Sequence, residues 1–206
     1  MTPSLSTLIF DLGNVVVRWE PHAALPPELS ERDVDDFFAR TDFFTKNADH
    51  DAGKPFGDWI SELESSDNPE DAKILKHYVE NFPASLTGLV PGTHELLHDL
   101  KNAGIRLFGL TNWSAETFHH AEAAVPSFEF FDDILVSGAE GMAKPDPRIF
   151  ELALSRWDLT PELTGFVDDS IANVESAESV GLTAHHFTSA KDARSWARDM
   201  TRSANV

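Results

Sequence analysis

From residue 93 to residue 200 the sequence alternates between two kinds of apolar pattern. Short apolar runs, typical of buried strands, are separated by stretches in which apolar residues recur at helical spacing. Strands that alternate with helices are expected to pair in parallel through right-handed crossovers, with helices on both faces of the sheet. The predicted strands span 105–111, 134–136, 164–168 and 182–187, and the predicted helices span 93–103, 115–124, 147–157, 173–180 and 190–200.

A further strand is expected near the N-terminus, over residues 7–13, where the apolar run TLIFDLG leads into the turn pair Gly13-Asn14. Between this strand and the alternating half lie residues 28–86, where helical spacing is present and no strand is indicated. Helices are predicted there over 33–44, 56–63 and 72–82, and a loop is predicted over 47–55.

We therefore predict an α/β fold with a Rossmann-like core of residues 1–17 and 89–206, and a small all-helical cap of residues 18–88 inserted after the first strand. An insertion at this point lies over the carboxyl end of the sheet, where open α/β folds bind ligands. The aromatic residues of the insertion are interpreted as its core, with a role as pocket lining left open: Phe37, Phe38, Phe43, Phe44, Phe56 and Trp59.

The formal net charge of −19 limits the partners that this surface accepts. It repels nucleic acid and anionic membranes, so we expect neither as a partner. It also repels phosphorylated ligands, so any anion site must be built locally from cationic side chains, backbone N–H groups or a metal ion. The absence of cysteine excludes disulfides, Cys-ligated zinc and thiol catalysis, and it fits a cytoplasmic location. Neither a signal peptide nor a membrane span is expected from the apolar runs.

Polar residues follow several of the predicted strands. Asp11 follows the first apolar run, Thr111-Asn112 ends the strand at 105–111, and Asp168-Asp169 ends the strand at 164–168, while Lys144 precedes a helix. Because the carboxyl ends of parallel strands meet at one edge of a sheet, we expect these side chains to form a single site. Two adjacent carboxylates at a buried edge repel each other unless a cation compensates their charge, which favours metal binding.

Four segments carry a resemblance that covers nearly the whole chain: FDLGNVV (10–16), LTNWS (110–114), GMAKPDPRIF (141–150) and VDDSIANV (167–174). Their order and spacing resemble the phosphatases of the haloacid dehalogenase superfamily, and the helical insertion resembles the cap of that superfamily. The first motif, DLGNV, is similar to a bacterial sugar-phosphate branch that includes glucose-1-phosphatase-like enzymes.

The resemblance implies that Asp11 is a nucleophile that attacks phosphorus and forms an aspartyl-phosphate. It also implies that Mg²⁺ is bound by Asp11, by the backbone carbonyl of Gly13 and by Asp169, with Asp168 binding directly or through water. Hard carboxylate and carbonyl oxygens suit Mg²⁺, which also accepts substrate phosphate as a ligand.

The remaining residues of the four motifs are expected to bind the phosphoryl group. Thr111 would donate its hydroxyl together with the Asn112 N–H, and Lys144 would neutralise phosphate charge and orient Asp11. The N–H groups of Leu12 and Gly13 could complete the anion cradle. Asn173 is expected either to bind Asp168 or Asp169 or to cap a helix.

Gly13 departs from the pattern, because most phosphatases of this superfamily have a second Asp two residues after the nucleophile. That Asp protonates the leaving group and activates water, which is worth about 10²–10⁴-fold. Three explanations stay open: a good leaving group such as a sugar anomeric oxygen, a loss of turnover, or a replacement residue. The candidate replacements are Glu20, His22, Asp49, His50 and Asp51, of which His22 and His50 are otherwise interpreted as surface histidines.

The function expected from the sequence is Mg²⁺-dependent hydrolysis of a small phosphorylated metabolite, for which a sugar phosphate is one candidate, by a monomer or homodimer. A metal-independent 2-haloacid dehalogenase, which would use Asp11 against carbon, is the first alternative. The second alternative is a non-catalytic phosphate-binding pseudo-enzyme, which the loss of the Asp at Gly13 motivates. The pair Asp168-Asp169 favours metal and phosphorus over the dehalogenase.

Overall fold

The computed structural model describes residues 4–201 and contains a five-stranded parallel sheet in the order β5-β4-β1-β6-β7. The strands are β1 (Thr7–Phe10), β4 (Arg106–Thr111), β5 (Asp133–Val136), β6 (Thr164–Asp168) and β7 (Thr183–His186). The parallel α/β core expected from the alternating pattern is therefore confirmed. The first strand ends earlier than predicted, at Phe10, and the chain turns at Asn14, whose backbone is in the left-handed region (φ 56°).

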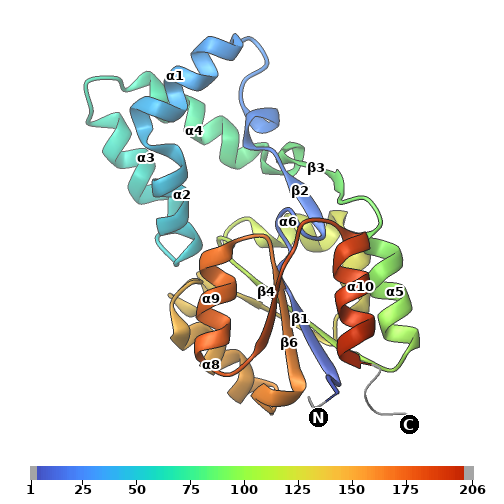
Figure 1. The fold of residues 1–206 in the computed structure, drawn as a ribbon. Coiled ribbons are helices and arrows are strands. Elements are labelled where there is room, and N and C mark those ends of the chain that lie inside the picture. Colours follow the sequence, from blue (N-terminus) through green and yellow to red (C-terminus); the bar gives the residue numbers. More distant parts are fainter. Residues whose placement is uncertain (1–3, 202–206) are drawn as a thin grey trace.

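Helices cover both faces of this sheet (Figure 1). The helices of this part of the chain are α5 (Thr93–Asn102), α6 (Phe118–Ala124), α7 (Ser137–Glu140), α8 (Pro147–Arg156), α9 (Ile171–Ser179) and α10 (Ala190–Thr201), of which α5, α8, α9 and α10 pack on the sheet. Alternate residues of β1 point to opposite faces: Leu8 packs in the core that includes α5 and α10, whereas Ile9 packs in the core that includes α8 and α9. The period of two along a strand thus explains why both faces need a helical cover.

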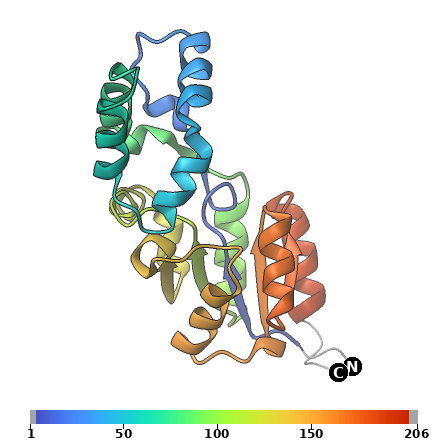
Figure 2. The same cartoon turned by 90° about the vertical axis from the view of Figure 1, so that its left-hand side faces the viewer.

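Four helices form a separate layer beyond the carboxyl ends of the strands (Figures 1 and 2). This helical layer consists of α1 (Glu31–Thr41), α2 (Phe43–Asp51), α3 (Phe56–Glu64) and α4 (Glu70–Glu80). Ser30 and Asp33 form a reciprocal capping box that fixes the start of α1. Among residues 4–201, no helix is long and apolar enough to cross a membrane.

Two predictions about this layer are wrong in detail. The single helix expected over 33–44 is divided at Asp42, whose left-handed conformation (φ 48°) ends α1 and starts α2 in a new direction. The loop expected over 47–55 is helical as far as Asp51. Burial of Phe43 against Phe37 explains the reorientation, because both rings enter the core of the layer only after the chain turns.

The aromatic residues of the layer are divided between its core and its surface. Phe37, Phe43 and Trp59 are fully buried together with Tyr78, as the interpretation as core expects, whereas Phe44 is 57% exposed. Phe56 is buried but also lines a cavity that faces the sheet. Core packing therefore accounts for most of these rings, and only Phe56 among them lines that cavity.

A short antiparallel pair of strands, which the sequence did not indicate, joins the two layers. Strand β2 (Val17–Trp19) pairs with β3 (Leu86–Leu89), with a shift in register between Val17 and Trp19. The prediction that residues 28–86 contain no strand is wrong only at Leu86, where β3 begins. Runs of three or four residues with an irregular register are too short for a period of two to be visible in the sequence.

Candidate active site

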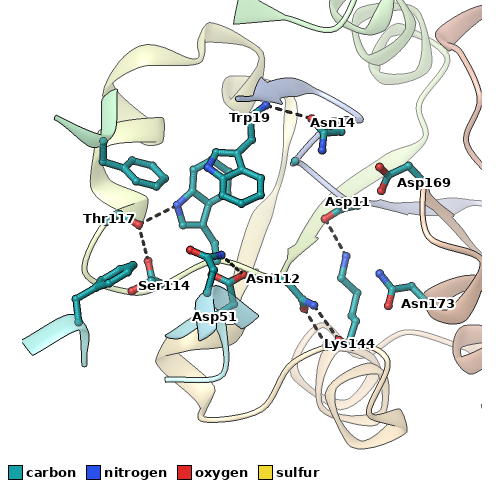
Figure 3. Close-up of a pocket in the computed structure, with 15 residues that line it drawn as sticks. Asp11, Asn14, Trp19, Asp51, Asn112, Ser114, Thr117, Lys144, Asp169 and Asn173 are labelled. Atoms are coloured by element: carbon teal, nitrogen blue, oxygen red, sulfur yellow. Dashed lines mark hydrogen bonds and ion pairs between the residues drawn. The ribbon is translucent and has the colours of Figure 1, made fainter. Parts of the chain in front are cut away.

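The polar residues expected at the sheet edge lie on its three central strands. Asp11 follows β1, Thr111 ends β4, and Asp168 ends β6, and β1 lies between the other two strands in the sheet. The Asp11 N–H donates to the carbonyl of Val167, which keeps Asp11 beside the end of β6. Lys144, from the loop before α8, reaches into the same place (Figure 3).

The ammonium group of Lys144 lies at the centre of this cluster. Its Nζ donates to Asp11 Oδ1 at 2.8 Å, to Asp168 Oδ2 at 2.7 Å and to the carbonyl of Leu110 at 2.7 Å. Lys144 and Asp168 are buried, and Asp11 is 8% exposed. All three ammonium donors are satisfied, so the position of the Asp11 carboxylate is fixed by a buried charge.

Asn112 holds Lys144 through its side chain. Its Nδ2 donates to the carbonyl of Lys144 at 2.8 Å, and its Oδ1 accepts from the Lys144 N–H at 2.9 Å. The sequence had indicated a role only for the Asn112 backbone. No sequence signal joins residues 32 positions apart in this way, because the contact exists only after β4 and the loop before α8 are brought together.

Asp168 is held by hydrogen bonds to both of its oxygens. Asn173 Nδ2 donates to Oδ1 at 3.0 Å and to Oδ2 at 3.1 Å, and the Ser170 N–H donates to Oδ1 at 2.8 Å. With Lys144 on Oδ2, Asp168 has few lone pairs left for another ligand. Asp169 is exposed at the cavity wall, so it is the more accessible of the adjacent pair.

The electrostatics of the cluster favour an additional cation. Asp11, Asp168 and Asp169 each offer a carboxylate oxygen, and these atoms lie within 4.8 Å of one another. The pKa of Asp11 is raised to about 7, chiefly by burial; Lys144 opposes the rise, and the charges of Asp168 and Asp169 contribute to it. Burial and the charge of Asp168 also raise the pKa of Asp169. One ammonium does not compensate three carboxylates, and the donor set consists of the hard oxygens that Mg²⁺ prefers.

Several hydrogen-bond donors near Asp11 have no partner within the described part of the chain. The hydroxyl of Thr111 is buried without a hydrogen bond, although Thr111 is not among the residues that line the cavity. The Asp11 N–H donates to the Val167 carbonyl, and the Asn14 N–H donates to the Val17 carbonyl. The N–H groups of Leu12 and Gly13, which lie between them in the sequence, make no hydrogen bond within residues 4–201. Consecutive free N–H groups can bind an anion.

A cavity opens between this cluster and the helical layer (Figure 3). Its walls combine charged, amide and aromatic side chains. It is lined by Asp11, Gly13, Asn14, Trp19, Asn47, Asp51, Phe56, Phe82, Asn112, Trp113, Ser114, Thr117, Lys144, Asp169 and Asn173. The four aromatic rings form an apolar wall that suits the organic part of a small ligand.

Asp51 is the carboxylate that the helical layer contributes to this cavity. Its Oδ2 accepts from Asn47 Nδ2 at 3.0 Å, and its backbone carbonyl accepts from Ser137 Oγ at 2.5 Å. The pKa of Asp51 is raised to about 7, and burial is the largest cause. Hydrogen bonding to the Ser114 backbone and to the Asn47 side chain opposes the rise, and the charge of Asp11 contributes to it.

The structure places the other four candidate replacements for the missing acid elsewhere. Glu20 and His22 do not line the cavity, and Asp49 forms an ion pair with Lys54 at 2.7 Å. The interpretation of His50 as a surface histidine is wrong: it is 3% exposed and its ring stacks on Phe56 and Trp59. Its Nδ1 lies 2.7 Å from the Lys54 carbonyl, so it supports the layer and does not face the cavity.

Substitution of Lys144 by Met is expected to lower the free energy of unfolding by about 3–5 kcal/mol, because it leaves two buried carboxylates without their cation. Urea unfolding at pH 7 measures the loss. Lys101→Met is the control, since Lys101 pairs with Asp132 where both side chains are 38% exposed, and a loss below about 1 kcal/mol is expected there. Equal losses in the two variants would contradict the central role of Lys144.

Comparison with known proteins agrees with this geometry. Residues 5–181 match the model of a hydrolase family described as haloacid dehalogenase-like hydrolase. The chain is 28% identical over 198 residues to a sesquiterpene phosphatase of Aspergillus oryzae, covering 91% of this chain and 92% of the relative. It is also 28% identical over 193 residues to a phosphoglycolate phosphatase of Cereibacter sphaeroides, covering 88% and 84%.

The fold is shared with solved structures of the same family. A HAD family enzyme from Bacteroides thetaiotaomicron, in complex with magnesium and inorganic phosphate, superposes with a TM-score of 0.65 at 16% identity, covering 90% of this chain and 95% of that chain. At this identity the likeness speaks for the fold alone. The family match over residues 5–181, joined to the parallel sheet and its carboxylate edge, shows that the chain belongs to the haloacid dehalogenase-like hydrolases.

Proposed function

We propose that the protein is a Mg²⁺-dependent phosphatase that hydrolyses a small phosphomonoester through an aspartyl-phosphate on Asp11. The observation that carries the proposal is the convergence of Asp11, Asp168, Asp169 and Lys144 at one sheet edge, facing a cavity. Three carboxylates and one ammonium leave negative charge uncompensated there. A divalent cation would compensate this charge and would take the substrate phosphate as a further ligand.

Each residue of the cluster has a distinct part in the proposed reaction. Asp11 attacks phosphorus, and Lys144 keeps its carboxylate in place and neutralises charge on the phosphoryl group. The Thr111 hydroxyl and the N–H groups of Leu12, Gly13 and Asn112 donate to the phosphoryl oxygens. Asp11, Asp169 and the Gly13 carbonyl would hold Mg²⁺, with Asp168 behind them, and the ion would supply positive charge for the phosphoryl group.

The helical layer is proposed to act as a cap over this site, with the boundaries expected from the sequence (residues 18–88 in a core of 1–17 and 89–206). The β2–β3 pair crosses both boundaries and supports a narrow connection there. The cap contributes Phe56 and Trp19 to the cavity, so it sets which organic group fits.

The substrate is proposed to be a small organic phosphomonoester with a body that packs on aromatic rings. A sugar phosphate, suggested by the DLGNV motif, can stack on Trp19 or Trp113. The names of the relatives, a sesquiterpene phosphatase and a phosphoglycolate phosphatase, widen the range of organic groups to be tried. A cytoplasmic location and a monomeric or homodimeric state stay predictions.

Asp11→Asn is expected to lower kcat by about 10⁴-fold or more, because the amide cannot replace the carboxylate as a nucleophile. The fold is expected to be retained, since the substitution removes a carboxylate whose pKa burial has raised. Phosphate release from a panel of phosphomonoesters measures activity, and circular dichroism checks the fold. Asp67→Asn, in an exposed loop, is the matched control. Wild-type turnover in Asp11→Asn would refute the mechanism.

Removal of divalent cations is expected to abolish turnover on the same panel, and added Mg²⁺ is expected to restore it, because the carboxylates then lack their counter-charge. The measurement compares EDTA-treated protein with and without Mg²⁺, and includes a 2-haloacid. Full activity in chelator, with halide release from the 2-haloacid, would favour the dehalogenase alternative. No turnover, with a rise in Tm on addition of phosphate or Mg²⁺, would favour the pseudo-enzyme.

Thr111→Val is expected to lower kcat by about 10²–10³-fold while leaving the free energy of unfolding unchanged or higher. The Thr111 hydroxyl has no hydrogen-bond partner among residues 4–201, so its loss removes only a donor to the phosphoryl group. Thr93→Val is the control, because the Thr93 hydroxyl donates to the Val15 carbonyl at 2.9 Å: it is expected to lose about 1 kcal/mol of stability and retain activity. Retained activity with a loss of stability in Thr111→Val would show that the Thr111 hydroxyl does not bind the phosphoryl group.

A further inference from the structure

The carboxylate cluster leaves the proposed reaction without a group that gives a proton to the leaving group and takes one from water. Gly13 offers no side chain, and a Cβ added there would meet nothing within 4 Å, so the space beside Asp11 is open. Of the described residues that line the cavity, three are carboxylates: Asp11, Asp169 and Asp51. The first two belong to the cluster that would hold the cation, which leaves Asp51.

We propose that Asp51 is a catalytic residue that supplies, from the helical layer, the general acid and base that Gly13 cannot supply. This inference rests on the proposed phosphatase function and adds to it a residue of the helical layer that lines the same cavity (Figure 3). It makes the helical layer a part of the catalytic machinery as well as a cover.

The backbone of Asp51 is fixed to the core. Its carbonyl accepts from Ser137 Oγ at 2.5 Å, and the same Oγ accepts from the Trp113 N–H at 2.9 Å, so Ser137 connects α2 to the loop after β4. The following turn is equally close: a Cβ on Gly53 would lie 3.1 Å from the Gly138 carbonyl oxygen. Only a glycine, here with φ of 100°, permits this approach.

The side chain of Asp51 is oriented as well. Asn47, one helical turn earlier, donates to Oδ2 at 3.0 Å, and the Ser114 backbone of the core favours the charged form of the carboxyl and so opposes the rise in its pKa. Partners from both layers therefore hold the carboxyl at the cavity wall. A proton donor must be held in position before its acidity matters, and the Asp51 carboxyl is held in position by these contacts.

The acidity of Asp51 suits a group that first gives and then takes a proton. Burial raises its pKa to about 7, against the opposing hydrogen bonds of Ser114 and Asn47 and with the added effect of the Asp11 charge. Near neutral pH both protonation states are populated, and catalysis by a proton donor is most efficient when its pKa lies near the working pH.

In the first step, an Asp11 carboxylate oxygen forms a bond to phosphorus while the bond from phosphorus to the ester oxygen breaks. The leaving oxygen keeps the electron pair and takes the proton of Asp51, so the alcohol departs neutral and Asp51 becomes a carboxylate. In the second step, Asp51 takes a proton from water as the water oxygen bonds to phosphorus. The bond from phosphorus to Asp11 breaks, its electron pair returns to the Asp11 carboxylate, and inorganic phosphate is released.

The test compares Asp51→Asn with Asp49→Asn on two substrates in Mg²⁺. Asp49 is a half-buried acid in the same helix that pairs with Lys54 and does not line the cavity. With n-butyl phosphate, whose alkoxide leaves poorly, Asp51→Asn is expected to lower kcat about 10²–10⁴-fold. With p-nitrophenyl phosphate, whose leaving group needs no proton, it is expected to release one p-nitrophenol per active site in a burst and then turn over slowly. Asp49→Asn is expected to behave as wild type.

Rescue provides a second readout that a purely structural role would not move. Gly13→Asp places a carboxyl in the open space beside Asp11, and in the Asp51→Asn background it is expected to restore butyl phosphate hydrolysis about tenfold or more. Asp51→Asn is expected to fold, because it removes an acid whose raised pKa reduces stability as pH rises from about 4 to about 7. If Asp51→Asn does not fold, Asn47→Ala replaces it, because this variant removes only the hydrogen-bond donor to Asp51. It is expected to lower the rate of butyl phosphate hydrolysis relative to that of p-nitrophenyl phosphate hydrolysis.

The proposal is overturned if Asp51→Asn hydrolyses butyl phosphate at the wild-type rate, or if both substrates lose activity equally without a burst. Either result, obtained while Asp11→Asn is inactive, removes Asp51 and leaves the proposed phosphatase intact. Absence of phosphate release from both substrates in the wild-type protein, or wild-type turnover in Asp11→Asn, overturns the phosphatase and the role of Asp51 together.

Discussion

The ammonium of Lys144, buried between Asp11 and Asp168, is the interaction on which the arrangement of the sheet edge depends. It joins the ends of two neighbouring strands to the loop before α8 and compensates part of a concentration of negative charge that would otherwise oppose folding. Burial disfavours the charged form of Lys144, but the two carboxylates outweigh it and raise its pKa. The negative charge that remains uncompensated favours the binding of a cation at this edge.

The helical layer is tied to this edge at a few defined points. Ser137 bonds both α2 and the loop after β4, and the Phe56 N–H donates to the Glu116 carboxylate of the core at 2.9 Å. These contacts bring the end of α2 close to the core, whereas α1 lies further from the sheet (Figures 1 and 2). The cavity therefore has lining residues from both the sheet edge and the helical layer.

Much of the fold could be predicted because the core has a strong period. The strand at 164–168 and the starts of α3, α5, α8 and α10 lie where the apolar spacing and the capping residues place them. The strands β2 and β3 could not be predicted, since three or four residues do not establish a period. The break at Asp42 was missed because an apolar pattern does not reveal a single residue in the left-handed region.

The sequence by itself determined the α/β fold class and the order of the polar residues along the chain, because apolar period and strand-end position are local properties. It also identified Gly13 as the position without an acid. Only the tertiary structure decided that the Asn112 side chain holds Lys144, that His50 is buried against two aromatic rings, and that Asp51 lines the cavity. These are contacts between distant segments, and their geometry and the burial that shifts a pKa exist only once the two layers have packed together.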